Sequence, residues 1–268
     1  MLFERPAYAP PMLKEGQLVF LLDDKGRKHW LRLERGMVKV QSLGVVDGER
    51  LLQAGDGARL VLAGKPFVLF TPGTVDLMGS LERGAQVITP KDAATIVLGL
   101  DLKDGDVVIE AGLGSASLTV ALLASVAPNG KVVSVELRPE FLEKGRRNIN
   151  RTLHAHLWTG HLGDVKDISL ELVADAMVLD MPDPWEALPN VCRLLRPGGR
   201  LCIYVPNTNQ LERAVKDMRA HGFVEVRALE NIQREMEVHE MGVRPSYETL
   251  GHTGYLAFGR LVRSTEVN

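Results

Sequence analysis

The sequence predicts a doubly wound α/β fold, with a mostly parallel sheet and an antiparallel last strand, preceded by a small β domain. Two observations support this prediction. From residue 84 onward, apolar runs of strand length alternate with helical patterns, which is typical of a parallel sheet with helices on both faces. Before residue 70, short apolar runs are separated only by turn residues. We therefore expect a β domain over 1–70, a linker with a helical piece over 71–89, and a larger α/β domain over 90–268.

The first part of the chain has the pattern of a small β barrel or sandwich. Residues 17–33 form a predicted hairpin, with Asp24, Lys25 and Gly26 in its turn. Further turns are predicted at 46–48 and 54–57, because each contains an Asp-Gly pair. Closely spaced short strands of this kind favour an antiparallel β structure.

The larger domain begins with a helix-start signal. Thr89 is the predicted N-cap, with Pro90 at the first helical position and Asp92 reaching back as in a capping box. We expect strands at 106–110, 131–136, 155–159, 175–181 and 200–206, and helices near 117–126, 139–151, 185–195 and 209–221. Two late apolar runs, 223–230 and 252–262, have no helical pattern between them, so an antiparallel strand pair is expected to complete the sheet.

Composition limits the class of protein. The 268 residues are 45% hydrophobic and carry a formal charge of −2, which gives no whole-protein signature of nucleic-acid binding. Cys192 and Cys202 belong to no Cys-x-x-Cys pair or His/Cys cluster, so no metal site and no disulfide is expected. No signal-length apolar core begins the chain and no apolar run approaches ~18 residues, so we expect no membrane segment and a cytoplasmic location.

A glycine-containing turn follows the strand that ends near Glu110. Gly112 and Gly114 let a backbone approach a ligand, and a later apolar run ends in Glu136, an acid that can hold ribose hydroxyls. Ser117 stands where a dinucleotide motif has its third glycine, so an NAD-dependent oxidoreductase fits less well. Alone, this turn is equally typical of a plain strand-to-helix connection.

Acids at successive strand ends strengthen the prediction of a site. Glu110, Glu136, Asp164 and Asp180 each lie at or just after the end of a predicted strand. Ligands of open α/β sheets bind outside the carboxyl ends of the strands, so we expect these four carboxylates around one crevice. Asp164 is placed to accept from an adenine amino group.

The loop over 180–185 (DMPDPW) is the most specific segment. Its two prolines stop a strand and fix an extended loop, which we expect to hold Asp180 and Trp185 at the mouth of the crevice. The alternative for Trp185 is that Pro184 opens a helix whose tryptophan packs in the core. With the glycine turn and Glu136, this loop suggests a methyltransferase acting on a nucleobase.

Six segments together resemble the tRNA adenine-N1 methyltransferase family that modifies the T-loop adenosine. They are RGAQVITPKDAA (83–94), EAGLGSASLT (110–119), VELRPE (135–140), LDMPDPWEAL (179–188), VPNTNQ (205–210) and GHTGYL (251–256). The resemblance implies an N-terminal β domain, a class I methyltransferase fold, S-adenosylmethionine as methyl donor, tRNA as substrate and usually a homotetramer.

The resemblance also implies roles for particular residues. The family's catalytic aspartate corresponds to Asp180, its cofactor loop to residues 112–116 and its ribose-binding acid to Glu136. The expected donor-binding residues are Glu110, Gly112, Leu113, Gly114, Ser115, Ala116, Glu136, Asp164 and Asp180. This sequence departs from the family at Thr89, where a tyrosine that offers a stacking surface is usual, and at Ala116, where glycine is usual.

The chemistry of the acceptor explains the need for a carboxylate. Adenine N1 has its own lone pair, so no base is needed, but methylation makes the ring cationic. Asp180 would accept a hydrogen bond from the exocyclic amino group and stabilise that charge. The base must leave its stack to reach the crevice. Candidate walls are Trp185, Tyr204, Tyr247 and Tyr255, each of which could instead be a core residue.

RNA contacts must come from local charge. Basic residues gather in the N-terminal domain at Lys25, Arg27, Lys28, Arg32, Arg35 and Lys39. Arg244 precedes the last strand, although such charges are also typical of a solvated face. Two alternatives remain open: a class I methyltransferase with another acceptor, and a non-catalytic RNA-binding subunit that kept the fold. Intact Glu136 and Asp180 favour an active enzyme.

Overall fold

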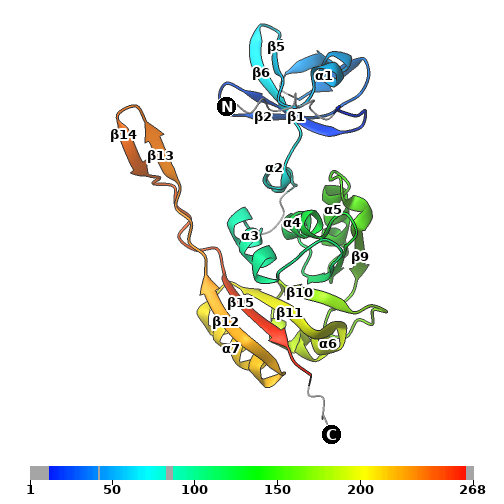
Figure 1. The fold of residues 1–268 in the computed structure, drawn as a ribbon, viewed down its shortest axis with the longest axis vertical. Coiled ribbons are helices and arrows are strands. Elements are labelled where there is room, and N and C mark those ends of the chain that lie inside the picture. The colour runs from blue at the N-terminus through cyan, green and yellow to red at the C-terminus, as the bar shows by residue number, and fades with distance from the viewer. Residues whose placement is uncertain (1–11, 42, 83–86, 264–268) are drawn as a thin grey trace, which may run out of the picture. The chain divides into compact units, whose positions relative to one another are not determined.

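The computed structural model describes residues 12–41, 43–82 and 87–263. By its internal contacts the chain divides into two compact units, with the boundary after Asp76. Figure 1 shows the β-rich first unit and the sheet and helices of the second, which confirms the predicted fold class. Among the described residues, no helix is long and apolar enough to cross a membrane.

The first unit is built on a four-stranded antiparallel sheet in the order β2-β1-β6-β5. Its strands are β1 (Leu18–Asp23), β2 (Lys28–Arg32), β5 (Arg59–Leu62) and β6 (Lys65–Phe70), and β3 (Met37–Val40) pairs separately with β4 (Gly44–Asp47). The predicted hairpin over 17–33 is confirmed as β1 and β2.

A short helix that was not predicted, α1 (Gly48–Ala54), connects the two segments expected as turns at 46–48 and 54–57. Asp47 caps this helix, because its side chain accepts from the backbone N–H groups of Glu49 and Arg50. Leu51 on the helix is fully buried in the core of this unit. The Asp-Gly pair therefore starts a helix instead of closing a hairpin.

The second unit contains a seven-stranded sheet in the order β12-β15-β11-β10-β7-β8-β9. The parallel strands are β7 (Val107–Ala111), β8 (Lys131–Glu136), β9 (Trp158–Leu162), β10 (Ala174–Leu179) and β11 (Leu195–Val205). The late strands are β12 (Phe223–Glu230) and β15 (Tyr255–Leu261), and β15 runs antiparallel to both β11 and β12. This confirms the antiparallel last strand.

Helices cover both faces of this sheet. They are α3 (Pro90–Gly99), α4 (Ser117–Val126), α5 (Pro139–Ile149), α6 (Leu188–Leu194) and α7 (Thr208–Ala220), preceded in the chain by α2 (Thr74–Ser80). Neighbouring strand residues face opposite cores, since Val108 packs with α3 and α4 while Ile109 packs with α6 and α7. This period of two accounts for the continuous apolar runs of the central strands.

Three elements differ from the prediction by more than a few residues or in type. A 3₁₀ turn over Ala155–Leu157 delays β9, which was predicted at 155–159. The helix predicted at 185–195 is divided into a 3₁₀ turn, Pro184–Ala187, and α6. Strand β11 begins at Leu195, so the segment predicted to start at residue 200 is longer than its apolar run.

A hairpin between β12 and β15 was not predicted. It consists of β13 (Met236–His239) and β14 (Gly242–Pro245), and Figure 1 shows it reaching away from the seven-stranded sheet. Large apolar side chains are exposed on it, including Met241, which is 98% exposed. Because residues 231–251 carry charges and Pro245, the sequence analysis assigned no strand to this interval.

Candidate active site

A glycine loop, residues 112–116, connects β7 to α4 in the second unit. Gly112 has φ +85°, and a Cβ atom there would lie 1.8 Å from the backbone oxygen of Asp180. The Asp180 N–H donates to the Ala111 oxygen at 2.8 Å, so the ends of β7 and β10 meet at this glycine. Gly112 therefore allows close approach of two strand ends, whereas Gly114, φ +53°, has open space around its missing Cβ.

Ala116 occupies the left-handed region of the backbone, with φ 64° and ψ 25°. An L-residue with a side chain is disfavoured there by about 1–2 kcal/mol, which explains why glycine suits this position. The Ala116 side chain is buried in the core beneath the loop. The loop thus holds local strain immediately before the first turn of α4.

Glu136, at the end of β8, lies against the glycine loop. Its Oε2 accepts from the N–H groups of Leu113 and Gly114, both at 3.1 Å, and its Oε1 accepts from the Arg138 N–H at 3.0 Å. A carboxylate that accepts several backbone N–H groups fixes the loop that supplies them. The structure therefore brings the predicted loop and the predicted acid together.

Glu110 is buried beneath the same loop. Its Oε2 accepts from the hydroxyls of Thr119, at 2.7 Å, and Ser134, at 2.8 Å. Burial raises the pKa of Glu110 to about 8, and the charges of Asp180 and Glu136 act in the same direction despite these two hydrogen bonds. The Glu110 carboxyl is consequently held largely protonated at neutral pH.

Asp180 follows β10 and is only partly exposed. Burial raises the pKa of Asp180 to about 7, with the charge of Glu136 adding to the shift. Asp164, at the end of β9, accepts from the Lys166 N–H at 2.9 Å and so closes a local turn. Glu110, Glu136 and Asp180 therefore interact electrostatically. Among the described residues, no hydrogen bond or ion pair joins Asp164 to these three carboxyl groups.

A small pocket beside the glycine loop is lined by Glu110, Asp180, Ile88 and residues 112–115. The Ser115 hydroxyl in its lining is buried and has no hydrogen-bond partner among the described residues. An unpaired buried hydroxyl is costly without a ligand. This orphaned hydroxyl, the open space at Gly114 and the adjoining carboxylates fit a polar, positively charged ligand such as S-adenosylmethionine.

Trp185 corrects the expectation that the DMPDPW loop places its ring at the mouth of the crevice. Pro184 opens the 3₁₀ turn, and the Trp185 ring is buried in the core formed with α6 and α7. The Arg213 guanidinium covers the ring, 4.3 Å from its centroid. The alternative interpretation of Trp185 as a core residue is the one that the structure supports.

The three tyrosines proposed as walls have different surroundings. Tyr204 is buried, and burial together with the charges of Asp92 and Asp180 raises the pKa of Tyr204 to about 12. Tyr255 is half-buried with its ring centroid 4.7 Å from that of His252. Tyr247 is exposed and lies under the Arg244 guanidinium. Among these three tyrosines, Tyr204 is the one whose pKa is raised in part by the charge of Asp180.

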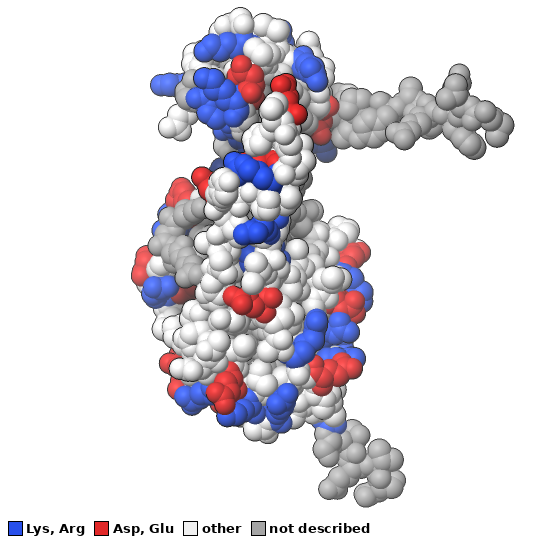
Figure 2. All heavy atoms as spheres, turned by 90° about the vertical axis from the view of Figure 1, so that its left-hand side faces the viewer, with Lys and Arg blue, Asp and Glu red and all other residues white. Residues whose placement is uncertain are grey.

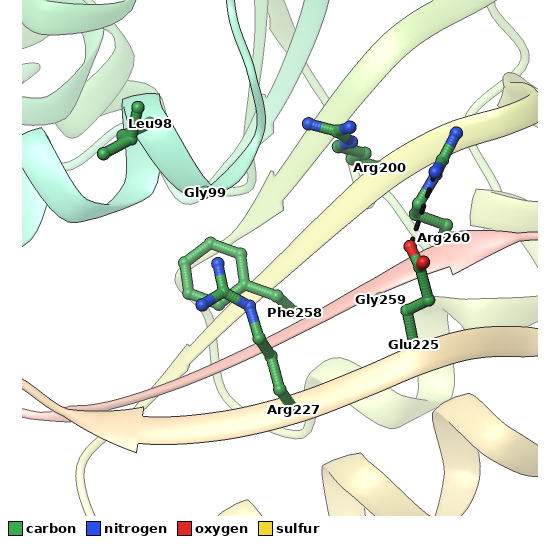
Figure 3. A pocket seen from close by; sticks show the side chains of 8 residues that line it. All are labelled: Leu98, Gly99, Arg200, Glu225, Arg227, Phe258, Gly259 and Arg260. Carbon is green, nitrogen blue, oxygen red and sulfur yellow. Dashed lines mark hydrogen bonds and ion pairs between the residues drawn. The ribbon is translucent and has the colours of Figure 1, made fainter.

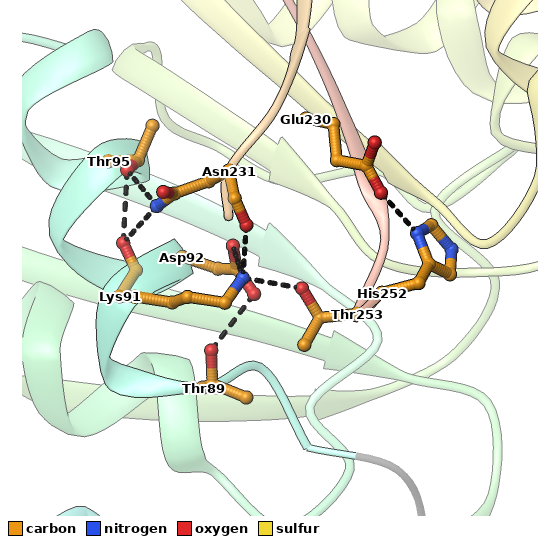
Figure 4. A network of polar contacts seen from close by, with 8 residues as sticks. All are labelled: Thr89, Lys91, Asp92, Thr95, Glu230, Asn231, His252 and Thr253. Atoms are coloured by element: carbon orange, nitrogen blue, oxygen red, sulfur yellow. Dashed lines mark hydrogen bonds and ion pairs between the residues drawn. The ribbon is translucent and has the colours of Figure 1, made fainter. Parts of the chain in front are cut away.

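A polar network at the start of α3 was missed by the sequence analysis (Figure 4). The Lys91 Nζ donates to Asp92 Oδ1 at 2.8 Å, to the Asn231 oxygen at 2.6 Å and to Thr253 Oγ1 at 2.6 Å. The Thr89 hydroxyl donates to Asp92 Oδ2 at 2.9 Å. The predicted N-cap at Thr89 and Pro90 at the first helical position are confirmed. Buried Asp92 reaches back to the Thr89 hydroxyl, and Thr89 makes no side-chain bond to a helix N–H, so the reciprocal bonding of a capping box is not formed.

This Lys91 network joins segments that are far apart in the sequence. Asn231 and Thr253 flank the excursion that carries β13 and β14, and Lys91 contacts both. Thr253 also bonds the Tyr204 hydroxyl, and a Cβ on Gly254 would lie 2.3 Å from the Tyr204 ring. The motifs TPKD (89–92) and GHTG (251–254) are visible in the sequence, but the sequence does not show that they contact each other through Lys91 and Thr253.

A larger pocket of about 350 Å³ lies at the other end of the sheet (Figure 3). Three arginines line it, Arg200, Arg227 and Arg260, with Glu225 paired to Arg260. Arg200 pairs in register with Ala176 near the start of β10, so this pocket is remote from the strand ends. It is not the site that the glycine loop forms.

Comparison with known proteins finds similar sequences over most of the chain. Residues 68–244 match the family described as tRNA methyltransferase complex GCD14 subunit. A Thermus thermophilus protein named tRNA (adenine(58)-N(1))-methyltransferase is 35% identical, over 89% of this chain and 94% of its own length. A Methanocaldococcus jannaschii protein named tRNA (adenine(57)-N(1)/adenine(58)-N(1))-methyltransferase is 30% identical, over 90% and 94%.

Solved structures give the same fold. An S-adenosylmethionine-dependent O-methyltransferase from Thermotoga maritima has a TM-score of 0.83 at 28% identity, covering 95% of this chain and 96% of its own. A tRNA (m1A58) methyltransferase from Aquifex aeolicus has a TM-score of 0.76 at 24% identity, covering 94% and 99%. The second likeness concerns the fold alone.

Proposed function

The chain belongs to the family of tRNA methyltransferase complex GCD14 subunits, and from that premise we propose that it transfers a methyl group from S-adenosylmethionine to N1 of a T-loop adenine in tRNA. The observation that carries this proposal is the position of Asp180 at the strand end that abuts the glycine loop. Asp180 also lines the small pocket beside that loop, which supports a role next to the donor. The adenine at position 58 is the proposed target, by likeness to the named relatives.

Residues of the second unit would hold the methyl donor, which supplies an activated methyl group on a sulfonium centre. Residues 112–116 form the proposed donor loop, with the Ser115 hydroxyl free to bond a ligand. Glu136 orders that loop from β8. Glu110 bonds the hydroxyls of Thr119 and Ser134 and lines the pocket beside the loop. Asp164 completes the proposed set from the end of β9.

Asp180 is proposed to act on the adenine. The carboxylate would accept a hydrogen bond from the exocyclic amino group and stabilise the positive charge that develops on the ring. Since N1 carries a lone pair, no proton has to be removed before the transfer. Burial raises the pKa of Asp180 to about 7, and the positive charge that the reaction generates on the adenine ring favours the ionised form of this carboxyl.

Surface charge is proposed to hold the RNA. Figure 2 shows Lys and Arg side chains on the first unit beside acidic ones. Within this cluster Arg27 pairs with Asp23, and Arg35 pairs with Glu15 and Glu49. Lys28 likewise pairs with Asp76, and Arg32 bonds the Gly16 oxygen. These pairings lower the local positive charge, so Lys25 and Lys39 are the contacts we propose. A tRNA substrate is consistent with a cytoplasmic location.

A homotetramer is proposed from the family resemblance, and the β13–β14 hairpin supports association. Met236, Val238, Met241 and Val243 are all exposed on this hairpin. A two-stranded hairpin by itself is marginally stable in water, and an apolar surface of this kind marks an interaction site. A second copy of the chain is the proposed partner, and light scattering on the purified protein would measure the assembly.

The proposed activity is tested with unmodified tRNA and radiolabelled methyl donor, followed by separation of the digested nucleosides. Asp180→Asn should lower the yield of 1-methyladenosine by about 100-fold or more, because the charge that stabilises the cationic ring is lost. Asp183→Asn is the matched control, since Asp183 lies in the same loop and asparagine tolerates its φ of 50°. Donor binding without transfer by the wild type would favour the non-catalytic alternative, and label in another nucleoside or a protein would favour another acceptor.

A further inference from the structure

Helix α5 presents one closely fitted face to the donor loop. Gly145 lies so near Leu113 that an added Cβ would be 2.4 Å from the leucine Cδ2. Asn148, one turn later on the same face, donates from Nδ2 to the Ser115 oxygen at 3.0 Å. Leu113 and Ser115 of the loop are therefore packed against or bonded to Gly145 and Asn148 of α5, which belong to no motif of the proposed site.

Asn148 makes further contacts that lead away from the loop. Its Oδ1 accepts from the Glu82 N–H at 3.1 Å, and its Nδ2 also donates to the Glu82 oxygen at 3.3 Å. Asn148 is only 1% exposed and its bond to the Ser115 oxygen is buried, whereas Glu82 is exposed and the two bonds to it are partly buried. One amide thus bonds the backbone of the donor loop and the backbone of the segment that enters this unit.

The partner of Asn148 in the loop is the residue with the orphaned hydroxyl. The Ser115 oxygen is held by Asn148 while the Ser115 side chain lines the pocket without a partner. Because the next residue, Ala116, is in a disfavoured backbone conformation, the loop needs external bonds to keep its shape. Asn148 supplies such a bond from a rigid helix.

We propose that Asn148 is a positioning residue that holds the donor loop in its binding shape and couples donor binding to the segment around Glu82. The inference rests on the proposed function, since it takes residues 112–116 as the donor loop. Asn148 does not touch the donor. It acts through the Ser115 backbone.

Binding of S-adenosylhomocysteine, the demethylated product of the donor, tests this by isothermal titration calorimetry. Asn148→Ala and Asn148→Asp both remove the amide donor, and each should weaken binding about tenfold, or about 1.4 kcal/mol. Arg151→Gln is the matched control, because Arg151 bonds the Ser80 oxygen in the same entering segment and, among the described residues, makes no hydrogen bond to the loop; its dissociation constant should equal that of the wild type. In turnover assays the KM for the donor should rise about tenfold, with kcat at saturating donor within twofold.

A second measurement uses the wild-type protein and does not depend on the folding of a variant. Hydrogen exchange of the Glu82 amide should slow when S-adenosylhomocysteine is bound, because Asn148 links that amide to the occupied loop. Unchanged exchange at Glu82, unchanged affinity in the Asn148 variants, or a lower kcat with unchanged KM would each overturn the inference. A wild-type protein that does not bind S-adenosylhomocysteine would instead overturn the proposed function.

Discussion

Gly112→Ala is the most sharply defined perturbation of the donor loop. The new methyl carbon would lie 1.8 Å from the backbone oxygen of Asp180 and 2.8 Å from its carbonyl carbon. Since an ordinary contact between carbon and oxygen is about 3.3 Å, the ends of β7 and β10 would have to part by roughly 1.5 Å. The atom that must move is backbone, so no side-chain rotation relieves the clash.

The expected cost combines two effects. The φ of +85° at Gly112 disfavours alanine by about 1–2 kcal/mol, and overpacking between two central strands adds about 1–3 kcal/mol. Displacing the backbone of Asp180 by more than 1 Å should lower methyl transfer by about 100-fold or more. The loss should therefore exceed what reduced stability alone would cause at a temperature where the variant is folded.

Gly114→Ala is the matched control. Gly114 also has a positive φ, +53°, but its added Cβ would have no atom within 4 Å. Only the backbone strain of about 1 kcal/mol should appear, and Ala116 shows that this loop accommodates alanine in the left-handed region. Gly114 belongs to the donor loop, so the two variants are compared by urea unfolding, and methyl transfer is measured for Gly112→Ala against the wild type. Equal losses of stability in the two variants, or wild-type transfer by Gly112→Ala, would contradict a clash at the strand ends.

Three further predictions concern the acids, the Lys91 network and Trp185. Because the pKa values of Asp180 and Glu110 are raised to about 7 and about 8 from 3.8 and 4.5, their favourable contribution is complete below about pH 4 and is lost as pH rises to about 8. The free energy of unfolding should fall over that interval, and Asp180→Asn should make the fall shallower; a parallel pH profile would contradict this. Thr253→Val should lower stability by about 1–3 kcal/mol in urea unfolding, because one buried Lys91 proton loses its acceptor, whereas Thr253→Ser should restore most of it. Trp185→Phe should keep most of the methyl transfer, since the ring is buried in the core, and a large loss in kcat with an unchanged melting temperature would instead indicate contact with the base.

Local pattern was enough to predict the order of the strands and helices around the donor loop. Glu136 and Asp180 follow apolar runs, and in a parallel sheet the carboxyl ends of the strands share one edge. This rule alone places the acids at the same edge as the glycine loop. The departure from the family's glycine at Ala116 was visible in the sequence, but the left-handed backbone at this residue was not predicted.

Other features depend on which side chains meet in three dimensions. The burial of Trp185 follows from the direction in which Pro184 turns the chain, and a proline is compatible with either an extended loop or a helix start. The hairpin of β13 and β14 alternates apolar and charged residues weakly, and α1 depends on whether Asp47 finds helix N–H groups. In these cases two local structures were compatible with the same residues.

Periodicity and strand ends are local properties of the chain, so the fold class, the glycine loop and the acids at the strand ends could be predicted from the residues alone. Three contacts could not be predicted in this way: Gly112 against the Asp180 backbone, Lys91 with residues 231 and 253, and Asn148 between the loop and Glu82. Each of these contacts joins residues distant in sequence. They are selected by burial and hydrogen-bond satisfaction in the folded chain, which no local pattern records.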